Sequence, residues 1–245
     1  MTNNSSQASN SRTVLISGAS RGIGRAIAER LLSDGHRLSL GVRRPQSLRG
    51  TNLDPEHNSN ERLLLHPYEA SDPASAAAWV EASCQHFGSI DSLVHCAGVF
   101  SRVPLRFAAG QEAEIEQLFA VNVMGPWWLT RAAWPQLAAH GAGRILVLVS
   151  MSGKRSKGTL AGYTTSKFAL MGLCQTMRNE GWEQGIRVSA ICPGWVNTDM
   201  AAAVQAMPAE AMTQPDEIGA LASQLLVLPN SCVPFELAVN CTLER

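Results

Sequence analysis

Hydrophobic and polar positions divide the chain into two alternating kinds of segment. Short, nearly continuous apolar runs rich in Leu, Ile and Val alternate with longer stretches of helical spacing. A strand that is apolar on both faces is typical of a parallel sheet covered by helices on both sides. The runs that predict strands are residues 13–17, 36–43, 62–66, 90–96, 143–150, 186–192 and 235–240.

The stretches between these runs predict helices. The first begins after residue 24, places Ile27 and Leu31 on one side, and ends at Gly35. Another, over 72–88, opens on Asp72, a capping residue that is followed by proline in the first turn. The remaining stretches predict helices around 111–122, over 126–140, and around the segment "GYTTSKFAL" at 162–170.

Strands that alternate with helices indicate an α/β protein. Right-handed crossovers then give a doubly wound, Rossmann-like sheet of about seven strands, mostly or wholly parallel, with helices on both faces. No composition shift marks a domain boundary, and the polar segment 51–62 is short enough to be a surface loop. We therefore predict one domain over residues 12–245, preceded by a polar, disordered tail over 1–11.

Composition and charge narrow the function classes. The chain has 245 residues, of which 45% are hydrophobic and 16% charged, and its net charge is zero. The chain lacks the excess of basic residues that is typical of nucleic-acid-binding proteins. It also has no apolar run long enough to span a bilayer. The six cysteines form no C-x-x-C pair, which favours a reduced, cytoplasmic protein. The histidines lack metal-ligand spacing, so we expect no metal site.

A glycine-rich turn follows the first predicted strand. The segment "LISGASRGIGRAIAERL" places Gly18, Gly22 and Gly24 between that strand and its helix. Glycine allows the backbone to approach a phosphate closely, and the helix N-terminus favours an anion. The turn therefore predicts a dinucleotide site, although its G-x-x-x-G-x-G spacing is also compatible with a tight turn that binds nothing.

The end of the second predicted strand bears on the choice of cofactor. An enzyme that prefers NAD(H) would carry an acidic residue there for the ribose hydroxyls, but the chain has Val42, followed by Arg43 and Arg44. Arg21 in the glycine turn can reach the same side. Guanidinium groups suit a 2′-phosphate, so the pattern favours NADP(H) over NAD(H). The alternative is that these arginines are ordinary surface charges.

Three residues further along the chain carry the candidate chemistry. Tyr163 and Lys167 are four apart on a predicted helix and so share a face. A nearby ammonium lowers the pKa of a phenol and makes it a better acid or base near neutral pH. Ser150 ends an apolar strand at the edge where ligands of such sheets bind. Each residue alone has an ordinary explanation, whereas the set with a dinucleotide turn favours an enzyme.

This combination resembles the short-chain dehydrogenase/reductase family, in its branch of about 250 residues. The resemblance covers residues 12–228. Its motifs here are "SGASRGIG" at 17–24, "CAG" at 96–98, "NVMG" at 122–125, the Ser150, Tyr163 and Lys167 set, and "PGWVNTDM" at 193–200.

The resemblance implies a role for each matching residue. Tyr163 would be the general acid in reduction or the base in oxidation, and Lys167 would lower its pKa and bind the nicotinamide ribose. Ser150 would orient the substrate oxygen, and Asn122 would hold a proton-relay water near Lys167. The residues expected to contact the cofactor, which include the three arginines discussed above, are Gly18, Ser20, Arg21, Gly22, Ile23, Gly24, Arg43, Arg44, Glu69, Ala70, Cys96, Ala97, Gly98, Tyr163, Lys167, Pro193, Gly194, Val196 and Thr198.

The chain departs from the family pattern in two places. Cys96 replaces an asparagine and cannot make its amide hydrogen bonds, so we expect the strand end to be held differently, through His95 as one possibility. The C-terminal "FELAVNCTLER" lacks the Asp-Gly-Gly of many relatives. The apolar helix faces near Trp127 and Phe168 and the resemblance together predict a homodimer or homotetramer, without choosing between them.

The expected reaction is hydride transfer between NADP(H) and a carbonyl or secondary alcohol, with reduction favoured. Residues expected to flank the substrate are Phe100, Ser150, Met151, Ser152, Tyr163 and Trp195, with the loop from about Met200 to Met212. That loop is small and apolar, which favours a modest hydrophobic ketone or aldehyde, a 3-oxoacyl thioester being one option. The alternatives are a non-redox lyase and an NAD(P)H-binding sensor on the same fold.

Overall fold

The computed structural model describes residues 11–57, 61–202 and 207–240. Its centre is a seven-stranded sheet in the order β3-β2-β1-β4-β5-β6-β7. Every neighbouring pair is parallel, which confirms the predicted doubly wound sheet. The strands are β1 Thr13–Ser17, β2 Arg37–Val42, β3 Leu63–Pro67, β4 Ser92–His95, β5 Arg144–Leu148, β6 Arg187–Pro193 and β7 Glu236–Val239.

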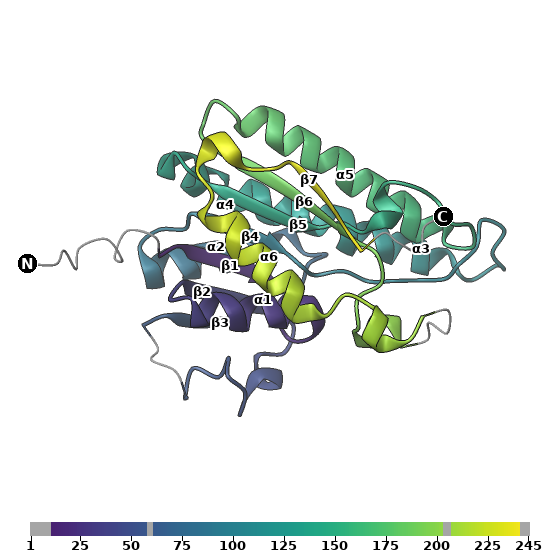
Figure 1. The fold of residues 1–245 in the computed structure, drawn as a ribbon, viewed down its shortest axis with the longest axis horizontal. Helices are drawn as coiled ribbons and strands as arrows, with labels where there is room; N and C mark the ends of the chain where they lie inside the picture. Colours follow the sequence, from purple (N-terminus) through teal and green to yellow (C-terminus); the bar gives the residue numbers. More distant parts are fainter. Residues whose placement is uncertain (1–10, 58–60, 203–206, 241–245) are drawn as a thin grey trace, which may run out of the picture.

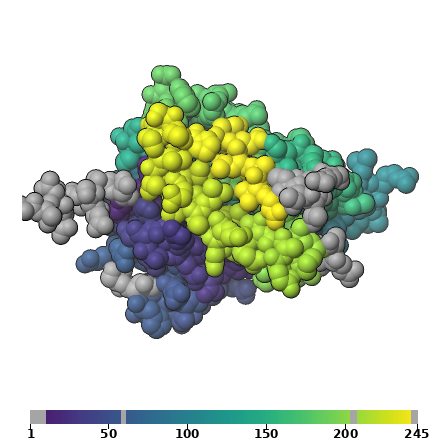
Figure 2. All heavy atoms as spheres, in the orientation of Figure 1, coloured from purple at the N-terminus to yellow at the C-terminus, as the bar shows by residue number. Residues whose placement is uncertain are grey.

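Helices cover both faces of this sheet (Figure 1). The helices α1 (Gly22–Ser33) and α6 (Pro215–Val227) pack together on one face. The other face carries α2 (Pro73–Phe87), α4 (Gly125–His140) and α5 (Ala161–Gly181). In Figure 2, α6 and β7 form a broad surface beside the purple N-terminal elements. The strand order reverses between β1 and β4, and ligands of such sheets bind at that switch point.

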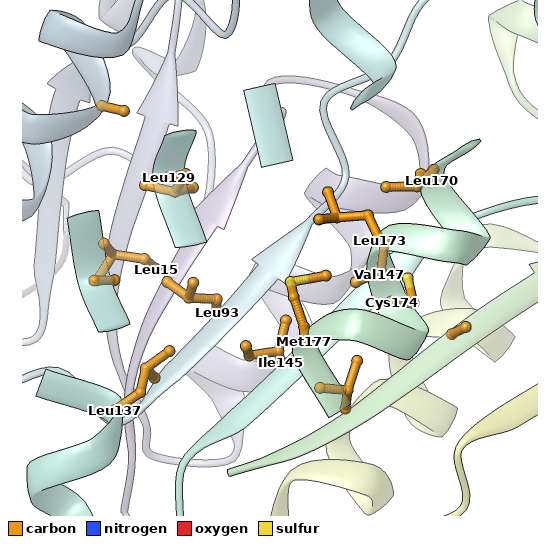
Figure 3. Packing of buried hydrophobic residues seen from close by; sticks show 14 of the residues in the cluster. Leu15, Leu93, Leu129, Leu137, Ile145, Val147, Leu170, Leu173, Cys174 and Met177 are labelled. Carbon is orange, nitrogen blue, oxygen red and sulfur yellow. The ribbon is translucent and has the colours of Figure 1, made fainter. Parts of the chain in front are cut away.

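The larger core cluster fills the face beneath α2, α4 and α5 (Figure 3). Leu15, Leu93 and Ile145 project from three adjacent strands toward Leu129 of α4 and Met177 of α5, and all five are buried. Burying a side chain of this size contributes about 1.5–3 kcal/mol relative to leaving it exposed. The two helices are thereby fixed against the sheet, and α5 carries the candidate catalytic pair.

A glycine in β2 makes room for the largest core side chain. Trp79 of α2 is fully buried, and its indole Nε1 donates to Ser39 Oγ at 2.8 Å. A Cβ atom at Gly41 would lie 2.5 Å from the Trp79 ring. Gly41 therefore lets α2 approach the sheet closely.

The predicted helices around 111–122 and over 126–140 are not separate, so that division is wrong. The helix α3 (Glu112–Phe119) continues through a π turn, Ala120–Met124, directly into α4. Proline lacks an amide N–H and disfavours the α conformation in the residue before it. The chain accommodates Pro126 within the first turn of α4, with the wider π turn just before it. Such turns are frequent at functional sites, and this one contains Asn122.

Two further expectations concern the ends of the chain and the membrane. The predicted tail over residues 1–11 lies, except for Ser11, outside the described residues. Among the helices that the structure does describe, none has the length and apolar character needed to cross a bilayer.

Candidate active site

The glycine turn lies at the carboxyl end of β1, at the switch point of the sheet. Gly18 has a φ of +72°, and a Cβ there would lie 2.6 Å from the backbone nitrogen of Ala97. A Cβ at Gly24 would lie 2.3 Å from the carbonyl oxygen of Gly18. Side chains at these positions would collide with backbone, so only glycine closes this turn.

The N-terminus of α1 fits an anionic group. Its N-cap residue, Arg21, makes no side-chain capping hydrogen bond, and the first turn contains no acidic residue. The first N–H groups of a helix have no partner within the helix, and they favour a phosphate. The arrangement is compatible with a pyrophosphate held by backbone N–H groups between Gly18 and Gly24.

Ser17 holds the strand end where Cys96 replaces the family asparagine. Its Oγ accepts hydrogen bonds from the backbone N–H of Cys96 at 3.2 Å and of Ala97 at 3.3 Å. The expectation that His95 does this is wrong, because its Nε2 is paired with Thr130 Oγ1 at 2.9 Å. Burial lowers the pKa of His95 to about 3, consistent with a structural, neutral imidazole.

The arginines predicted to read the 2′-phosphate lie around the same edge. Arg43 and Arg44 follow β2 and are exposed, whereas Val42 is buried. Arg21 points a guanidinium nitrogen toward Asp199, 3.8 Å from its carboxylate. Both side chains of that pair are largely exposed, so it is a weak contact. Phosphate binding by these arginines stays a prediction.

The adenine-side residues differ from each other in their surroundings. Glu69 is exposed, and its carboxylate accepts from the backbone N–H and hydroxyl of Ser71. Ala70 is buried, and a Cβ at Gly125 would lie 3.0 Å from its Cβ. Their contacts with a cofactor stay predictions.

The segment after β6 returns to the glycine turn. A Cβ at Gly194 would lie 2.6 Å from the carbonyl oxygen of Asn240, so this turn packs tightly on the end of β7. Val196 forms a β-bridge with Thr213 and is buried. Thr198 lies beside Gly22, where a Cβ would be 3.4 Å from its Cγ2. The motif at 193–198 therefore borders the glycine turn, and its contact with a nicotinamide stays a prediction.

Ser150 occupies a strained position just after β5. Its φ of 137° is unusual for a residue with a side chain, and strain of this kind costs about 1–3 kcal/mol. Its Oγ accepts from the backbone N–H of Ser152 at 3.1 Å and is hydrogen-bonded to the side chain of Tyr163. The structure thus brings together Ser150 and Tyr163, which are far apart in sequence.

Lys167 lies on the same helix face as Tyr163 and is hydrogen-bonded to the end of β5. The ammonium donates to the carbonyl oxygen of Leu148 at 3.0 Å and lies 5.8 Å from the centre of the Tyr163 ring. Burial raises the pKa of Tyr163, and the hydrogen bond with Ser150 only partly offsets it. Burial also lowers the pKa of Lys167 to about 8. The lowering of the phenol's pKa by this lysine stays a prediction.

Asn122 is fully buried behind this pair. Its Oδ1 accepts from the backbone N–H of Val99 at 2.9 Å, and its Nδ2 donates to Val99 O at 3.0 Å and Ser166 Oγ at 3.1 Å. The amide thus fixes the strand β4 extension against α5. The relay water assigned to Asn122 stays a prediction, since the side-chain amide already makes three hydrogen bonds.

The predicted substrate residues form an apolar wall in part. The Phe100 ring meets the Tyr163 ring edge-on, with ring centres 4.9 Å apart. Met151 and Ser152 lie in a short 3₁₀ turn, Met151–Gly153, directly after Ser150. Trp195 packs instead in a small separate cluster with Ala201, Met207 and Met212. Part of the predicted 200–212 loop, residues 203–206, lies outside the described residues.

Sequence reasoning missed several residues that hold this site. The sequence assigns Ser17 no role beyond its place in the glycine motif, and it assigns none to Ser166 or to the carbonyl of Leu148. The polar Ser17 at the end of an apolar strand was a usable signal. The partners of Asn122 and Lys167 depend on the tertiary arrangement, and no local pattern indicates them.

Comparisons with known proteins bear on this site. The sequence profile of the family described as "short chain dehydrogenase" matches residues 12–209. Agropine synthesis reductase of Rhizobium rhizogenes is 36% identical over 234 residues, which are 96% of this chain and 53% of that protein. The chain therefore spans about half the length of this relative.

Two solved structures are similar over nearly the whole chain. One is an alcohol dehydrogenase from the archaeon Thermococcus sibiricus in complex with 5-hydroxy-NADP, with a TM-score of 0.82, 29% identity, and coverage of 93% of this chain and 95% of that one. The other is a metagenomic short-chain oxidoreductase in complex with NADP, with a TM-score of 0.77, 31% identity, and coverage of 93% and 96%.

Proposed function

The chain belongs to the short-chain dehydrogenase family, and on that premise we propose that it is an NADP(H)-dependent reductase of ketones or aldehydes. The proposal rests on one juxtaposition above all. A glycine turn that fits a dinucleotide lies at the same sheet edge as the hydrogen-bonded Ser150 and Tyr163. An NAD(P)H-binding sensor would need only the glycine turn, and a non-redox lyase would need neither feature. Hydride transfer needs both.

The residues of the site have separate tasks in this reaction. A bound NADPH would supply the hydride to the carbonyl carbon and leave as NADP⁺. Ser150 orients the carbonyl oxygen by a hydrogen bond. Tyr163 Oη donates its proton to that oxygen, which completes the secondary alcohol, and a proton from solvent restores the phenol. Lys167 would hold the nicotinamide ribose of the bound cofactor.

The choice of NADP(H) rests on the side chains at the end of β2. A buried Val42 occupies the position where an acidic residue would read a ribose hydroxyl, and Arg43 and Arg44 follow it in exposed positions. The complexes of the two similar structures with NADP and with 5-hydroxy-NADP support the same cofactor.

Replacing Arg43 with alanine is expected to weaken the binding of NADPH about tenfold and to leave the affinity for NADH nearly unchanged. The reason is that the guanidinium would contact only the 2′-phosphate. The check is Kd for both cofactors by fluorescence titration. Arg62, an exposed arginine at the amino end of β3, is the matched control, and Arg62→Ala should change neither value. An equal loss for both cofactors would contradict the phosphate assignment.

The reaction itself is tested by an NADPH-oxidation screen. The panel should contain small and medium hydrophobic ketones, aldehydes and 3-oxoacyl thioesters, together with the corresponding alcohols and NADP⁺. Turnover that requires both NADPH and a carbonyl compound is the expected result. NADPH binding without turnover of any of them would favour a sensor instead.

A second copy of the chain is the partner that we propose for the exposed face of α4 and α5. Trp127 and Phe168 are 49% and 46% exposed on these helices. Gly172, in the middle of α5, is exposed, and a Cβ there would contact nothing in the described chain. Glycine inside a helix costs about 1 kcal/mol relative to alanine, and a closely packed neighbouring helix would explain it.

Phe168→Glu is expected to shift the protein from a dimer or tetramer to a smaller species, because a charge would be buried at that contact. Analytical ultracentrifugation at several protein concentrations measures the change. Leu105→Glu alters a more exposed apolar residue outside the two helices and should leave the assembly intact. An unchanged mass for Phe168→Glu would place the contact elsewhere.

A further inference from the structure

Two loops beside the candidate active site carry positive charge and no carboxylate. Residues 99–111 contain Arg102 and Arg106, and residues 151–160 contain Lys154, Arg155 and Lys157. Neither segment has an aspartate or a glutamate, although the net charge of the whole chain is zero. Within the two loops all charged side chains are therefore basic, and the nearest acidic residues in the sequence are Glu112, Glu114 and Glu116 of α3.

Both loops are positioned by residues of the site itself. The first loop begins at Phe100, whose ring meets the Tyr163 ring. It then projects past α3 at the right of Figure 1. The second loop begins directly after Ser150 and ends at Leu160, whose carbonyl accepts from Thr164 in the first turn of α5. Both loops thus begin next to residues of the candidate site.

The helix after the first loop keeps the two loops together. A Cβ at Gly162 of α5 would lie 2.5 Å from Ile115 of α3, so these helices are in close contact. Ser101 Oγ donates to Glu114 at 2.7 Å, and the backbone N–H of Gly110 donates to Glu112 at 2.7 Å. Both ends of the arginine loop are therefore tied to the start of α3.

The positive charge at the tips of these loops is not neutralised within the described chain. Lys154 forms an ion pair with Glu236. Arg102, Arg106 and Lys157 are exposed, and in the described part of the chain none lies within 4.0 Å of a carboxylate. The glutamates at the start of α3 bind the ends of the arginine loop instead of its guanidinium groups.

We propose that the substrate carries an anionic group, a carboxylate or a phosphate, and that Arg102, Arg106 and Lys157 recognise it while the carbonyl lies at Tyr163. This inference rests on the proposed function and refines its substrate class. The apolar wall at Phe100 receives the reacting end, and the basic loops receive the charged end. Arginine binds carboxylates and phosphates through paired N–H donors, and a cleft lined by one sign of charge speeds capture of the opposite sign.

Matched substrate pairs test the inference. 5-Oxohexanoate and its methyl ester differ in a carboxylate, while acetoacetyl-CoA and acetoacetyl-N-acetylcysteamine differ in the phosphorylated tail. We expect kcat/KM for NADPH oxidation to be about tenfold higher for the anionic member of at least one pair. The preferred pair identifies the group as a carboxylate or a phosphate. The preference should fall as salt rises from about 0.05 to 0.5 M, because salt screens exposed charges.

Variants assign the preference to the loops. Arg102→Gln with Arg106→Gln, and separately Lys157→Gln, should abolish or reduce the preference and leave kcat/KM for the neutral member within about twofold. Arg62→Gln, at the opposite edge of the sheet, should leave the preference intact. Equal rates for both members of each pair would overturn the anionic class while leaving the reductase proposal standing. Failure of every compound to oxidise NADPH would overturn both.

Discussion

Replacing Tyr163 with phenylalanine is expected to lower kcat for carbonyl reduction about a thousandfold, because a positioned general acid contributes about 10²–10⁴ in rate. The substitution removes only Oη, which is the atom that Ser150 contacts and that would face the carbonyl oxygen. The ring keeps its contact with Phe100, so the fold and the cofactor site should be unchanged. Steady-state kinetics and an NADPH titration measure the two effects.

The chain offers a matched control for this variant in its one other tyrosine. Tyr68 is buried against Trp79, and its hydroxyl donates to the carbonyl oxygen of Gly125 at 3.5 Å. Tyr68→Phe should keep kcat within about twofold, since the substitution leaves the packed ring in place. Undiminished turnover in Tyr163→Phe would refute its assignment as the acid.

The same residue predicts opposite pH dependences for the two directions. Burial raises the pKa of Tyr163, so the phenol keeps its proton through neutral pH. Reduction, which uses the protonated form, should therefore hold its rate at neutral pH and decline only in alkaline solution. Oxidation, which uses the phenolate, should accelerate as pH rises over the same range.

The sequence predicted those parts of the protein that local patterns determine. Apolar runs such as 13–17 and 143–150 became buried strands because a strand covered on both faces must be apolar throughout. The glycine turn was predictable because Gly18 and Gly24 occupy positions that no other residue fits. The pair of Tyr163 and Lys167 was predictable because helical spacing alone places residues i and i+4 on one face.

Other features depend on contacts between distant segments and had no local signal. The π turn at Asn122 joins two stretches that the pattern predicts as separate helices. Ser17 reaches the N–H groups of Cys96 and Ala97 across 79 and 80 residues. Lys167 donates to a carbonyl of β5, a partner that the spacing along its own helix does not indicate. For Ser17 and Lys167 the hydrogen-bond partner comes from another strand, which no local pattern specifies.

Replacing Lys167 with methionine is expected to lower kcat at least a hundredfold and to weaken the binding of NADPH, while the protein stays folded. Methionine has a similar length and suits the buried site, which is surrounded by Cys96, Cys174 and Cys192. A loss of rate with unchanged NADPH affinity would contradict the ribose contact proposed for the ammonium. Stability measurements add a second, independent test of its burial.

The pH dependence of stability isolates the cost of burying this ammonium. Burial lowers the pKa of Lys167 from 10.5 to about 8. Between these values the unfolded chain binds more protons than the folded one, so this group makes the free energy of unfolding rise with pH. Below about pH 8 both states are protonated, and the full cost, about 3 kcal/mol, is present.

Lys167→Met removes this pH-dependent cost of burying the ammonium. It also leaves the Leu148 carbonyl without its donor, which destabilises the variant by about 1–3 kcal/mol at any pH. We therefore expect the variant's stability, relative to the unsubstituted protein, to fall by about 2 kcal/mol between pH 7 and pH 10. Urea unfolding at several pH values measures this difference. Lys157→Met, which alters an exposed lysine, should give a constant difference across the same range. A constant difference for Lys167→Met as well would mean that the ammonium titrates as it does in water.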